Sequence, residues 1–598
     1  MTSARLARGL GVFAVALIAM GVLWYPAFAS PRASGWGDWQ WFHHMWEAGR
    51  VAYVRWGEAP LWNPHHCGGV PLWGNPQAQV YSPTYLIFAL PFGTTLGHKL
   101  FILLHAVAGF AGMYVLARRE VSLTRASSLF AAIVWCASGF FAWHGAGGHA
   151  TFLAFYYAPA LLLAWRAAER DLRWSAAVAA LMVLVVLEGG HYPFPYFVLV
   201  LAIDTLVRAI TLPRAIPRLA MATLLSGGLT GLLGAFRFLP ILLALRANPH
   251  PVPDPDWVSP SEILEMLTAR THEYRFAGHG WVWPEYGAYV GWVVVALGTL
   301  GALIALFGSV RPRISPRRRS TMVAILVGAI AFFFFTQGSA TPWHPWPLLQ
   351  ELPFYRSIHV PSRFRVLLIF YMALLAGLAI DRIARWIESL PVRADVRALA
   401  LALPWVIALC VTVDVYAVNL TIIDRWNEET VGERAPGEHH LVRGRSYLEE
   451  YANYPSENVG TIDCYDPVPW PRSTRLWLGE VPQARIEPAS AGRVISWGRT
   501  SLTVWAVVEL DEPARVIFNQ NYNEDWSSPQ GAAVSDEVRL AVDVRRPGAQ
   551  RVSARYFPSD LPVSVGISIA GALACLLVAL APWRRRRAQP IRRSKSAA

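Results

Sequence analysis

Apolar runs long enough to cross a bilayer recur along the whole chain, and this feature limits the fold more than any other. A helix needs about 20 mostly apolar residues to cross the hydrocarbon core. The candidate segments are 8–28, 98–117, 126–143, 149–166, 175–190, 192–209, 219–244, 287–307, 321–337, 363–380, 399–419 and 561–582. Only 16% of the 598 residues are charged, whereas soluble proteins carry about 25%. The sequence therefore predicts a polytopic α-helical membrane protein with about twelve transmembrane helices.

Arginines gather in every second linker between these segments. Cytoplasmic linkers of membrane proteins carry an excess of Lys and Arg, so these linkers and both termini are expected to be cytoplasmic. The net charge of +13 then reflects membrane topology, and nucleic acid is not expected as a partner. The basic residues are Arg118, Arg119 and Arg125; Arg166, Arg170 and Arg173; Arg208, Arg214 and Arg218; those of 311–319; Arg382, Arg385, Arg393 and Arg397; and the tail "RRRRAQPIRRSK".

The first apolar segment has two interpretations. It ends in "YPAFAS", and such an A-x-A pattern is typical of signal-peptide cleavage. However, its apolar run is longer than the usual 7–15 residues of a signal peptide. We expect an uncleaved helix, and cleavage would leave the remaining topology unchanged.

Four longer segments are expected on the outer face: 29–97, 245–286, 338–362 and 420–560. The last of them alternates apolar and polar residues in "TSLTVWAVVEL" and "EVRLAVDV", which is the period of a half-buried strand. We therefore predict three parts: a transmembrane domain 1–419, an extracytoplasmic β-sandwich-like domain 420–560, and a final helix with a basic tail, 561–598. The residues on one face of the predicted strands are Leu502, Val504, Ala506, Val508 and Leu510, then Val538, Leu540, Val542 and Val544.

The loop 29–97 begins with "GWGDWQWFHHMW", where one carboxylate, Asp38, lies among four tryptophans. Long loops without their own secondary structure are usually functional or disordered, and this one is too aromatic for disorder. We expect an ordered cap over the helices. Asp38 is interpreted either as a catalytic base or as the N-cap of a following helix. The tryptophans are expected to anchor the chain at the membrane interface: Trp36, Trp39, Trp41 and Trp46.

Histidines and cysteines of the same loop raise the question of zinc. Zinc sites need three or four converging ligands, but adjacent histidines point in different directions, so hydrogen-bonding histidines are the preferred interpretation. Cys67 and Cys464 are both expected outside, which leaves a disulfide between them open. Cys136, Cys410 and Cys575 are expected in the core. The histidines concerned are His43, His44, His65 and His66.

Several ionisable residues lie at the predicted outer ends of helices. Ionisable groups at membrane depth are costly and usually face a cavity or a partner. We expect these residues to line one outward-facing cleft together with Asp38, and isolated pairing in the core is the alternative. They are His144, His149, Glu188, His191 and Glu285.

Arginines at the outer boundary in "FYRSIHVPSRFR" contradict the usual charge asymmetry, so they need a compensating partner. A guanidinium binds phosphate in a bidentate fork, which makes phosphate one candidate partner for Arg356 and Arg363. A salt bridge to Glu351 or Glu285 is the alternative. Arg237, almost inside an apolar segment, is expected to be a second phosphate ligand or the partner of a buried acid.

A set of motifs in the same order resembles YfhO-type bacterial membrane proteins, which are similar to the GT-C glycosyltransferases. The resemblance covers nearly the whole chain. The motifs are "GDW…GEAPLWNP…GGVPLWGNPQAQVYSP", "GGHATFLAFYYAPALLLAW", "GGHYPFPYFVLV", "PEYGAYVGWVVVAL", "LPFYRSIHVPSRFRVLLIFYMALLAGLAIDR", "NQNYNEDWSSPQG" and "VRRPGAQRVSARYFPSD".

The resemblance implies an enzyme of the bacterial inner (plasma) membrane that moves a sugar from a polyprenyl-phosphate carrier to a cell-envelope glycan or lipid outside. A transporter or flippase of lipid-linked glycans and a non-catalytic scaffold are the alternatives. The chain has no nucleotide-binding motif, and no nucleotide is expected. No cofactor is assigned, and a divalent metal ion is left open. Predicted catalytic residues are Asp38 and Glu188; predicted substrate-binding residues are His149, His191, Glu285, Arg237, Arg356 and Arg363.

Overall fold

The computed structural model describes residues 3–581 except 248–251, 253, 273–275, 277, 310–313, 392, 429, 433–434, 445–450 and 466–469. The basic tail lies outside the described residues. In the described part, ten helices are long and apolar enough to cross a membrane. They run over Gly9–Ala29, Thr94–Val121, Arg125–Ala146, Pro193–Thr211, Pro213–Leu233, Trp292–Ser309, Pro316–Thr336, Pro361–Ser389, Leu401–Asn427 and Leu561–Leu580. The prediction of a polytopic helical membrane protein is confirmed.

Two predicted spans are not among these ten. Segment 149–166 begins as a 3₁₀ helix, η3 (Ala150–Tyr157), and continues as the 13-residue helix α7 (Ala158–Arg170). Segment 175–190 forms the 14-residue helix α8 (Trp174–Leu187), which ends before Gly189 and Gly190. At about 1.5 Å per residue, a helix of that length is shorter than the hydrocarbon core, which is about 30 Å thick.

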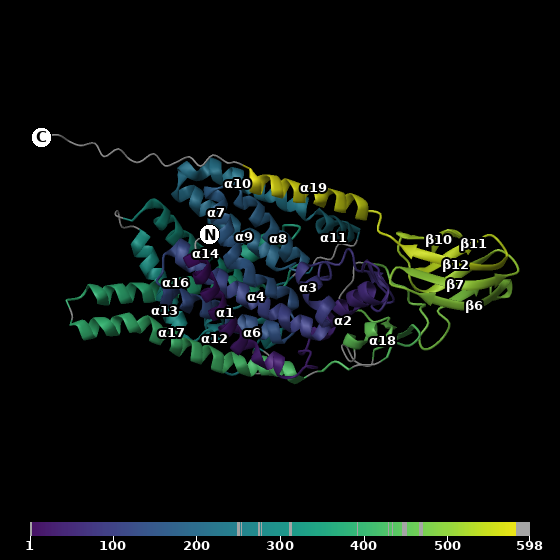
Figure 1. Cartoon of the computed structure of the whole chain (residues 1–598), viewed down its shortest axis with the longest axis horizontal. Helices are drawn as coiled ribbons and strands as arrows, with labels where there is room; N and C mark the ends of the chain where they lie inside the picture. The colour runs from purple at the N-terminus through teal and green to yellow at the C-terminus, as the bar shows by residue number, and fades with distance from the viewer. Residues whose placement is uncertain are drawn as a thin grey trace.

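Figure 1 shows how the helices of the described residues are arranged. Their bounds are α1 Ser3–Ala29, α2 Trp39–Arg50, α3 Pro83–Phe92, α4 Thr94–Leu116, α5 Arg125–Cys136, α6 Gly139–Ala146, α9 Pro193–Thr211, α10 Ile216–Leu233, α11 Ala235–Ala247, α12 Pro260–Thr268, α13 Trp292–Ser309, α14 Pro316–Thr336, α15 Pro345–Gln350, α16 Arg365–Ser389, α17 Ala394–Ile423, α18 Tyr454–Glu457 and α19 Leu561–Leu580.

Helix α16 forms the centre of the bundle. Every residue from Arg365 to Asp381 is buried, and α5, α13, α14 and α17 pack around it. A helix that is apolar on all sides is typical of such a central position. Its N-terminal end is preceded by the 3₁₀ turn η6 (Pro361–Phe364), so Arg363 and Arg365 lie where the most buried helix meets the preceding loop.

The first loop is ordered and folds into a cap of its own. It contains α2, the short hairpin β1 (Trp62–Asn63) and β2 (Val70–Pro71), and α3. The predicted role of its tryptophans as interfacial anchors is wrong for Trp39, Trp41 and Trp46, which are fully buried. Their indole N–H groups donate to Gly145 O, Gln77 Oε1 and Gln79 Oε1, so these rings bind the cap to itself and to α6.

A β-sandwich lies at one end of the molecule, beyond α2, α3 and α18 (Figure 1). Its two antiparallel sheets have the orders β10-β11-β8-β5 and β6-β7-β12-β9. The predicted inward faces are confirmed for the strands that carry Leu502 to Leu510 and Leu540 to Val544. The strands are β5 Ala484–Glu487, β6 Gly492–Arg499, β7 Thr503–Leu510, β8 Ala514–Asn521, β9 Trp526–Ser527, β10 Gly531–Asp536, β11 Arg539–Val544 and β12 Gly548–Tyr556.

The first loop and the β-rich segment are interlocked. Trp62 of the loop packs against Trp526 and Tyr556 in the apolar core of the sandwich. The segment before the sandwich, with β3 (His440–Val442) parallel to β4 (Val459–Thr461), also contacts the loop through hydrogen bonds of Val459 and Thr461 with His65. The disulfide that the sequence left open is present and joins Cys67 to Cys464. Two regions that are almost 400 residues apart therefore form one extramembrane unit.

Removal of this disulfide is expected to loosen that unit. A cross-link across 397 residues restricts the unfolded chain strongly, and disulfides typically contribute about 2–4 kcal/mol. We expect Cys67→Ser to lower the thermal unfolding temperature of the purified protein measured without reductant. Cys410→Ser, at an exposed free cysteine, is the matched control. Equal unfolding temperatures for both variants would contradict this role.

Candidate active site

Asp38 lies at the N-cap position of α2, but its side chain makes no capping hydrogen bond. Instead, its Oδ2 lies 3.3 Å from Nε2 of His149, and the carboxylate remains 32% exposed. The contact depends on a glycine turn: the Asp38 N–H donates to Gly147 O, and a Cβ on Gly148, which has φ +91°, would lie 2.1 Å from Trp39 N. Asp38 therefore occupies the N-cap position of α2, but its side chain does not act as a cap.

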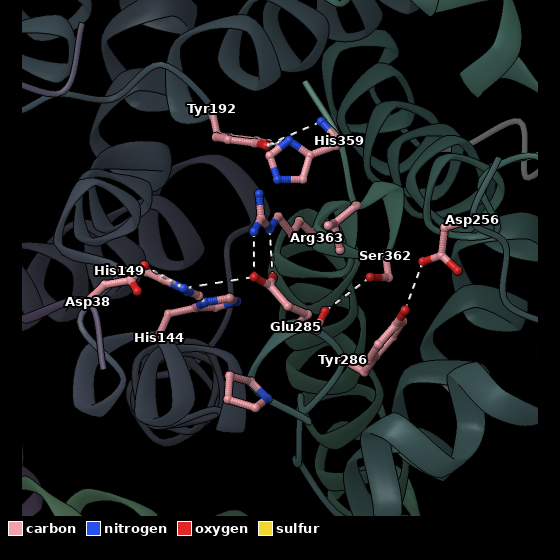
Figure 2. A network of polar contacts seen from close by, with 12 residues as sticks. Asp38, His144, His149, Tyr192, Asp256, Glu285, Tyr286, His359, Ser362 and Arg363 are labelled. Carbon is pink, nitrogen blue, oxygen red and sulfur yellow. Dashed lines mark hydrogen bonds and ion pairs between the residues drawn. The ribbon is translucent and has the colours of Figure 1, made fainter. Parts of the chain in front are cut away.

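Glu285 and Arg363 form a buried bidentate ion pair next to this contact (Figure 2). Arg363 Nε donates to Glu285 Oε2 at 2.7 Å, and Nη2 donates to Oε1 at 2.5 Å. Glu285 Oε1 is also 3.8 Å from His149 Nε2. His149 thus lies between the two carboxylates. The structure brings Asp38, His149 and Glu285 together, as the sequence predicted.

The electrostatics of the site keep Glu285 ionised. Burial raises the pKa of this carboxyl, but the charge and hydrogen bonds of Arg363, and then the charge of Arg365, outweigh burial and hold the pKa at about 2. A buried carboxylate needs such partners, because an unpaired buried charge is very costly. Glu285 is therefore a fixed anion at neutral pH.

Arg363 is enclosed by aromatic rings on its faces. Its guanidinium carbon lies 4.6 Å from the ring centre of Tyr192 and 5.0 Å from that of Phe152. The Tyr192 hydroxyl is 2.9 Å from His359 Nδ1. Nη1 makes no hydrogen bond within the described part of the chain, and in Figure 2 it points toward Tyr192 and His359. One donor group of Arg363 is thus left for a ligand. The sequence analysis missed Tyr192, because its context "GGHYP" indicated only the start of a helix.

Arg365 holds the backbone turn that carries Glu285. It is fully buried and donates to the backbone carbonyls of Pro284, Glu285, Gly287 and Ser362. These bonds fix the 3₁₀ turn η5 (Trp283–Glu285) that presents Glu285. Arg365 Nη2 also lies 3.1 Å from Nε2 of His144.

Glu188, predicted as a second catalytic acid, lies in a different place. It is fully buried, and its carboxylate contacts His105 Nε2 at 2.6 Å, Thr84 Oγ1 at 3.0 Å and the Tyr157 hydroxyl at 3.2 Å. None of these contacts involves Asp38, His149 or Glu285. The structure therefore places it in the core pairing that was the alternative interpretation, where it holds α3 and α4 together.

Arg237 and Arg356 also lie apart from the Asp38 site, whereas His191 is close enough to Arg363 and His149 for their charges to act on it. Arg237 donates to the carbonyls of Trp73, Asn75 and Ala78 and so holds the first loop, a role that neither expectation included. Arg356 is exposed, and its nearest acid is Glu351 at 4.0 Å. His191 binds its own turn at Gly189 O, and burial lowers its pKa to about 4.

The loop histidines do not form the zinc site that was considered. Cys67 is in the disulfide. His44 and His65 bond to the backbone carbonyls of Tyr451 and Val459, while His66 bonds to the Tyr451 hydroxyl. Burial lowers the pKa of His44 to about 4. These are hydrogen-bonding histidines inside the interlock of loop and β-rich segment.

One set of side chains in the described residues has the spacing of a metal site: the ligand atoms of His144, His149 and Glu285 lie within 4.8 Å of one another. Their donor atoms are already engaged, however. Glu285 is held by Arg363, His144 Nε2 faces Arg365, and the two histidines bond to each other. Two guanidinium groups beside the set oppose a second cation. As arranged, these residues do not fit a divalent metal ion.

Comparison with known proteins gave structural similarities alone. Neither the family models nor the curated proteins compared match this sequence. The Archaeoglobus fulgidus oligosaccharyltransferase has a TM-score of 0.45 at 13% identity over 77% of this chain, which spans 65% of its length. Arabinofuranosyltransferase AftD from mycobacteria has 0.44 at 13% over 94%, with 40% of its length spanned. ArnT from Cupriavidus metallidurans bound to undecaprenyl phosphate has 0.39 at 15%, with 84% and 98% covered.

Proposed function

We propose that this protein is a GT-C-type membrane glycosyltransferase that moves a sugar from a polyprenyl-phosphate carrier to an acceptor outside the cytoplasm. The observation that carries the proposal is the partly exposed Asp38 carboxylate, held by His149 beside the Glu285–Arg363 pair where the outer loops meet the helices. In this proposal the phosphate of a lipid-linked donor lies at this junction of loops and helices, and the protein lies in the bacterial inner membrane with both termini cytoplasmic.

In the proposed reaction Asp38 accepts a proton. The acceptor hydroxyl loses its proton to the Asp38 carboxylate, and its oxygen forms a bond to the anomeric carbon of the sugar. The bond between that carbon and the phosphate oxygen breaks, and the electron pair leaves with polyprenyl phosphate. The acceptor is a cell-envelope glycan or lipid, and neither nucleotide nor nucleic acid takes part.

Arg363 supplies the positive charge for the leaving phosphate. Its free Nη1 donor is oriented toward Tyr192 and His359, and the rings of Tyr192 and Phe152 lie close to the guanidinium of a side chain that is only 7% exposed. A charged donor fixed in advance where negative charge develops stabilises a transition state more than a mobile one does. The pair with Glu285 provides this fixation.

The test is sugar transfer by the purified full-length protein in vesicles. Polyprenyl-phosphate sugars with different headgroups are offered together with an envelope-glycan or lipid acceptor, and the glycosylated product is measured. We expect transfer from at least one donor, with stoichiometric release of polyprenyl phosphate.

Two other outcomes would replace the proposal. Movement of a labelled lipid-linked sugar between leaflets without product formation would favour the transporter or flippase. Binding of the lipid with neither transfer nor movement would favour a non-catalytic scaffold. Polar groups gathered at one end of the helices, as in the Asp38 site, support the enzyme over a transporter, whose sites lie near the membrane midplane.

A further inference from the structure

A continuous chain of polar contacts extends from Asp38 into the core of the protein. His149 Nε2 faces Asp38, His149 Nδ1 shares a hydrogen bond with His144 Nδ1, and His144 Nε2 lies 3.1 Å from Arg365 Nη2. Helices α6 and α16 supply the two inner members, and the turn after α6 supplies His149. His144 and Arg365 are fully buried, so water does not replace these contacts.

The chemistry of arginine determines where each proton lies. A guanidinium only donates hydrogen bonds, so His144 Nε2 must accept and its proton must be on Nδ1. The His144 Nδ1–H can then only donate to His149 Nδ1, which must be the unprotonated nitrogen. The proton of His149 is consequently on Nε2, facing Asp38 at 3.3 Å and Glu285 at 3.8 Å.

We infer that Arg365 and His144 are positioning residues that fix the tautomer of His149 as Nε2–H. His149 then donates toward the Asp38 carboxylate and keeps its ring in place, while both of its nitrogens are occupied. In this state His149 is neither a general base nor a metal ligand, and Asp38 is the group that accepts a proton. The tautomer assignment stands on geometry; its effect on rate rests on the proposed function.

A matched pair of substitutions at His144 separates the effect of its hydrogen bond to His149 from the effect of its packing. In His144→Asn an amide nitrogen takes the place of Nδ1 and still donates to His149. His144→Leu keeps a similar volume but removes the donor. Both variants lose the acceptor for Arg365, whose bonds to four carbonyls remain. The difference between the two variants therefore reports on the donor to His149.

The primary readout is the ¹⁵N spectrum of histidine-labelled full-length protein, with the His149 signals assigned from His149→Gln. We expect Nε2 protonated and Nδ1 unprotonated in the parent protein and in His144→Asn, and a mixture of tautomers in His144→Leu. A protonated Nδ1 in the parent protein, or an unchanged tautomer in His144→Leu, would overturn the inference.

The second readout is transfer kinetics. We expect kcat about 10-fold lower in His144→Leu with KM unchanged, and kcat of His144→Asn within about 3-fold of the parent protein. Equal kcat losses in both variants would overturn the positioning role. If neither the parent protein nor a variant transfers sugar while the tautomers follow the expectation, the proposed function fails. The positioning of His149 by His144 and Arg365 then still holds.

Discussion

Asp38→Asn is expected to lower sugar transfer about 10²–10⁴-fold, the usual contribution of a positioned base. The amide is nearly the same size as the carboxylate and its oxygen still faces His149 Nε2, but it cannot accept the proton of the acceptor hydroxyl. The loss should therefore appear in kcat, with little change in KM for the lipid-linked donor. Initial rates of product formation at several donor concentrations measure both.

A matched control is available at the same end of the helices. Asp424 directly follows α17 and is exposed. Within the part of the chain that the structure describes, its side chain makes no hydrogen bond or ion pair. Asp424→Asn removes the same charge and should transfer sugar at the parent rate. Equal kcat for Asp38→Asn and the parent protein would exclude Asp38 as the base.

Glu285→Gln is expected to give the largest loss of stability, about 3–5 kcal/mol, because it leaves Arg363 as an uncompensated buried charge. Both side chains of the pair are only 7% exposed. Thermal unfolding of the purified protein in detergent measures the effect, and a temperature equal to that of the parent protein would contradict the prediction. Glu351→Gln is the control, since Glu351 is 82% exposed.

The double variant Glu285→Gln with Arg363→Met tests the origin of that loss. Removal of both charges leaves neither group unpaired, so the double variant should be more stable than Glu285→Gln alone. A double variant at least as unstable as the sum of the single ones would assign the loss to packing.

Acid pH provides an independent test of the same pair. Folding holds the pKa of Glu285 at about 2, below the usual 4.5. The stability that Glu285 contributes is therefore complete above about pH 4.5 and is lost as the pH falls toward 2.

The sequence contained enough information for most of the helices because length and apolarity are local properties. It failed at 149–166 and 175–190, where apolar composition was sufficient but Pro159 and the Gly189–Gly190 pair shorten the helices. The strand faces around Leu502 to Leu510 followed directly from the period of two residues.

The site was predicted only in part, because its assembly depends on which faces of distant helices meet. Asp38, His149 and Glu285 were grouped correctly from their common place at outer helix ends. Glu188 has the same local signal, yet it points to His105 on α4, and nothing in its own sequence distinguishes the two cases. The pairing of Arg363 with Glu285 and not with Glu351 likewise required the three-dimensional arrangement.

The interlock of the first loop with the late β-rich segment imposes an order on biosynthesis. The helix that Asp38 precedes is held by Tyr451 and Ala452, which contact His44 and Gln40, and Cys464 follows Cys67 by 397 residues. At about 5–20 residues per second, the ribosome needs roughly 20–80 s to deliver these partners. Until then the cap lacks these contacts and the cross-link, so the interlocked unit cannot form before Cys464 has been translated.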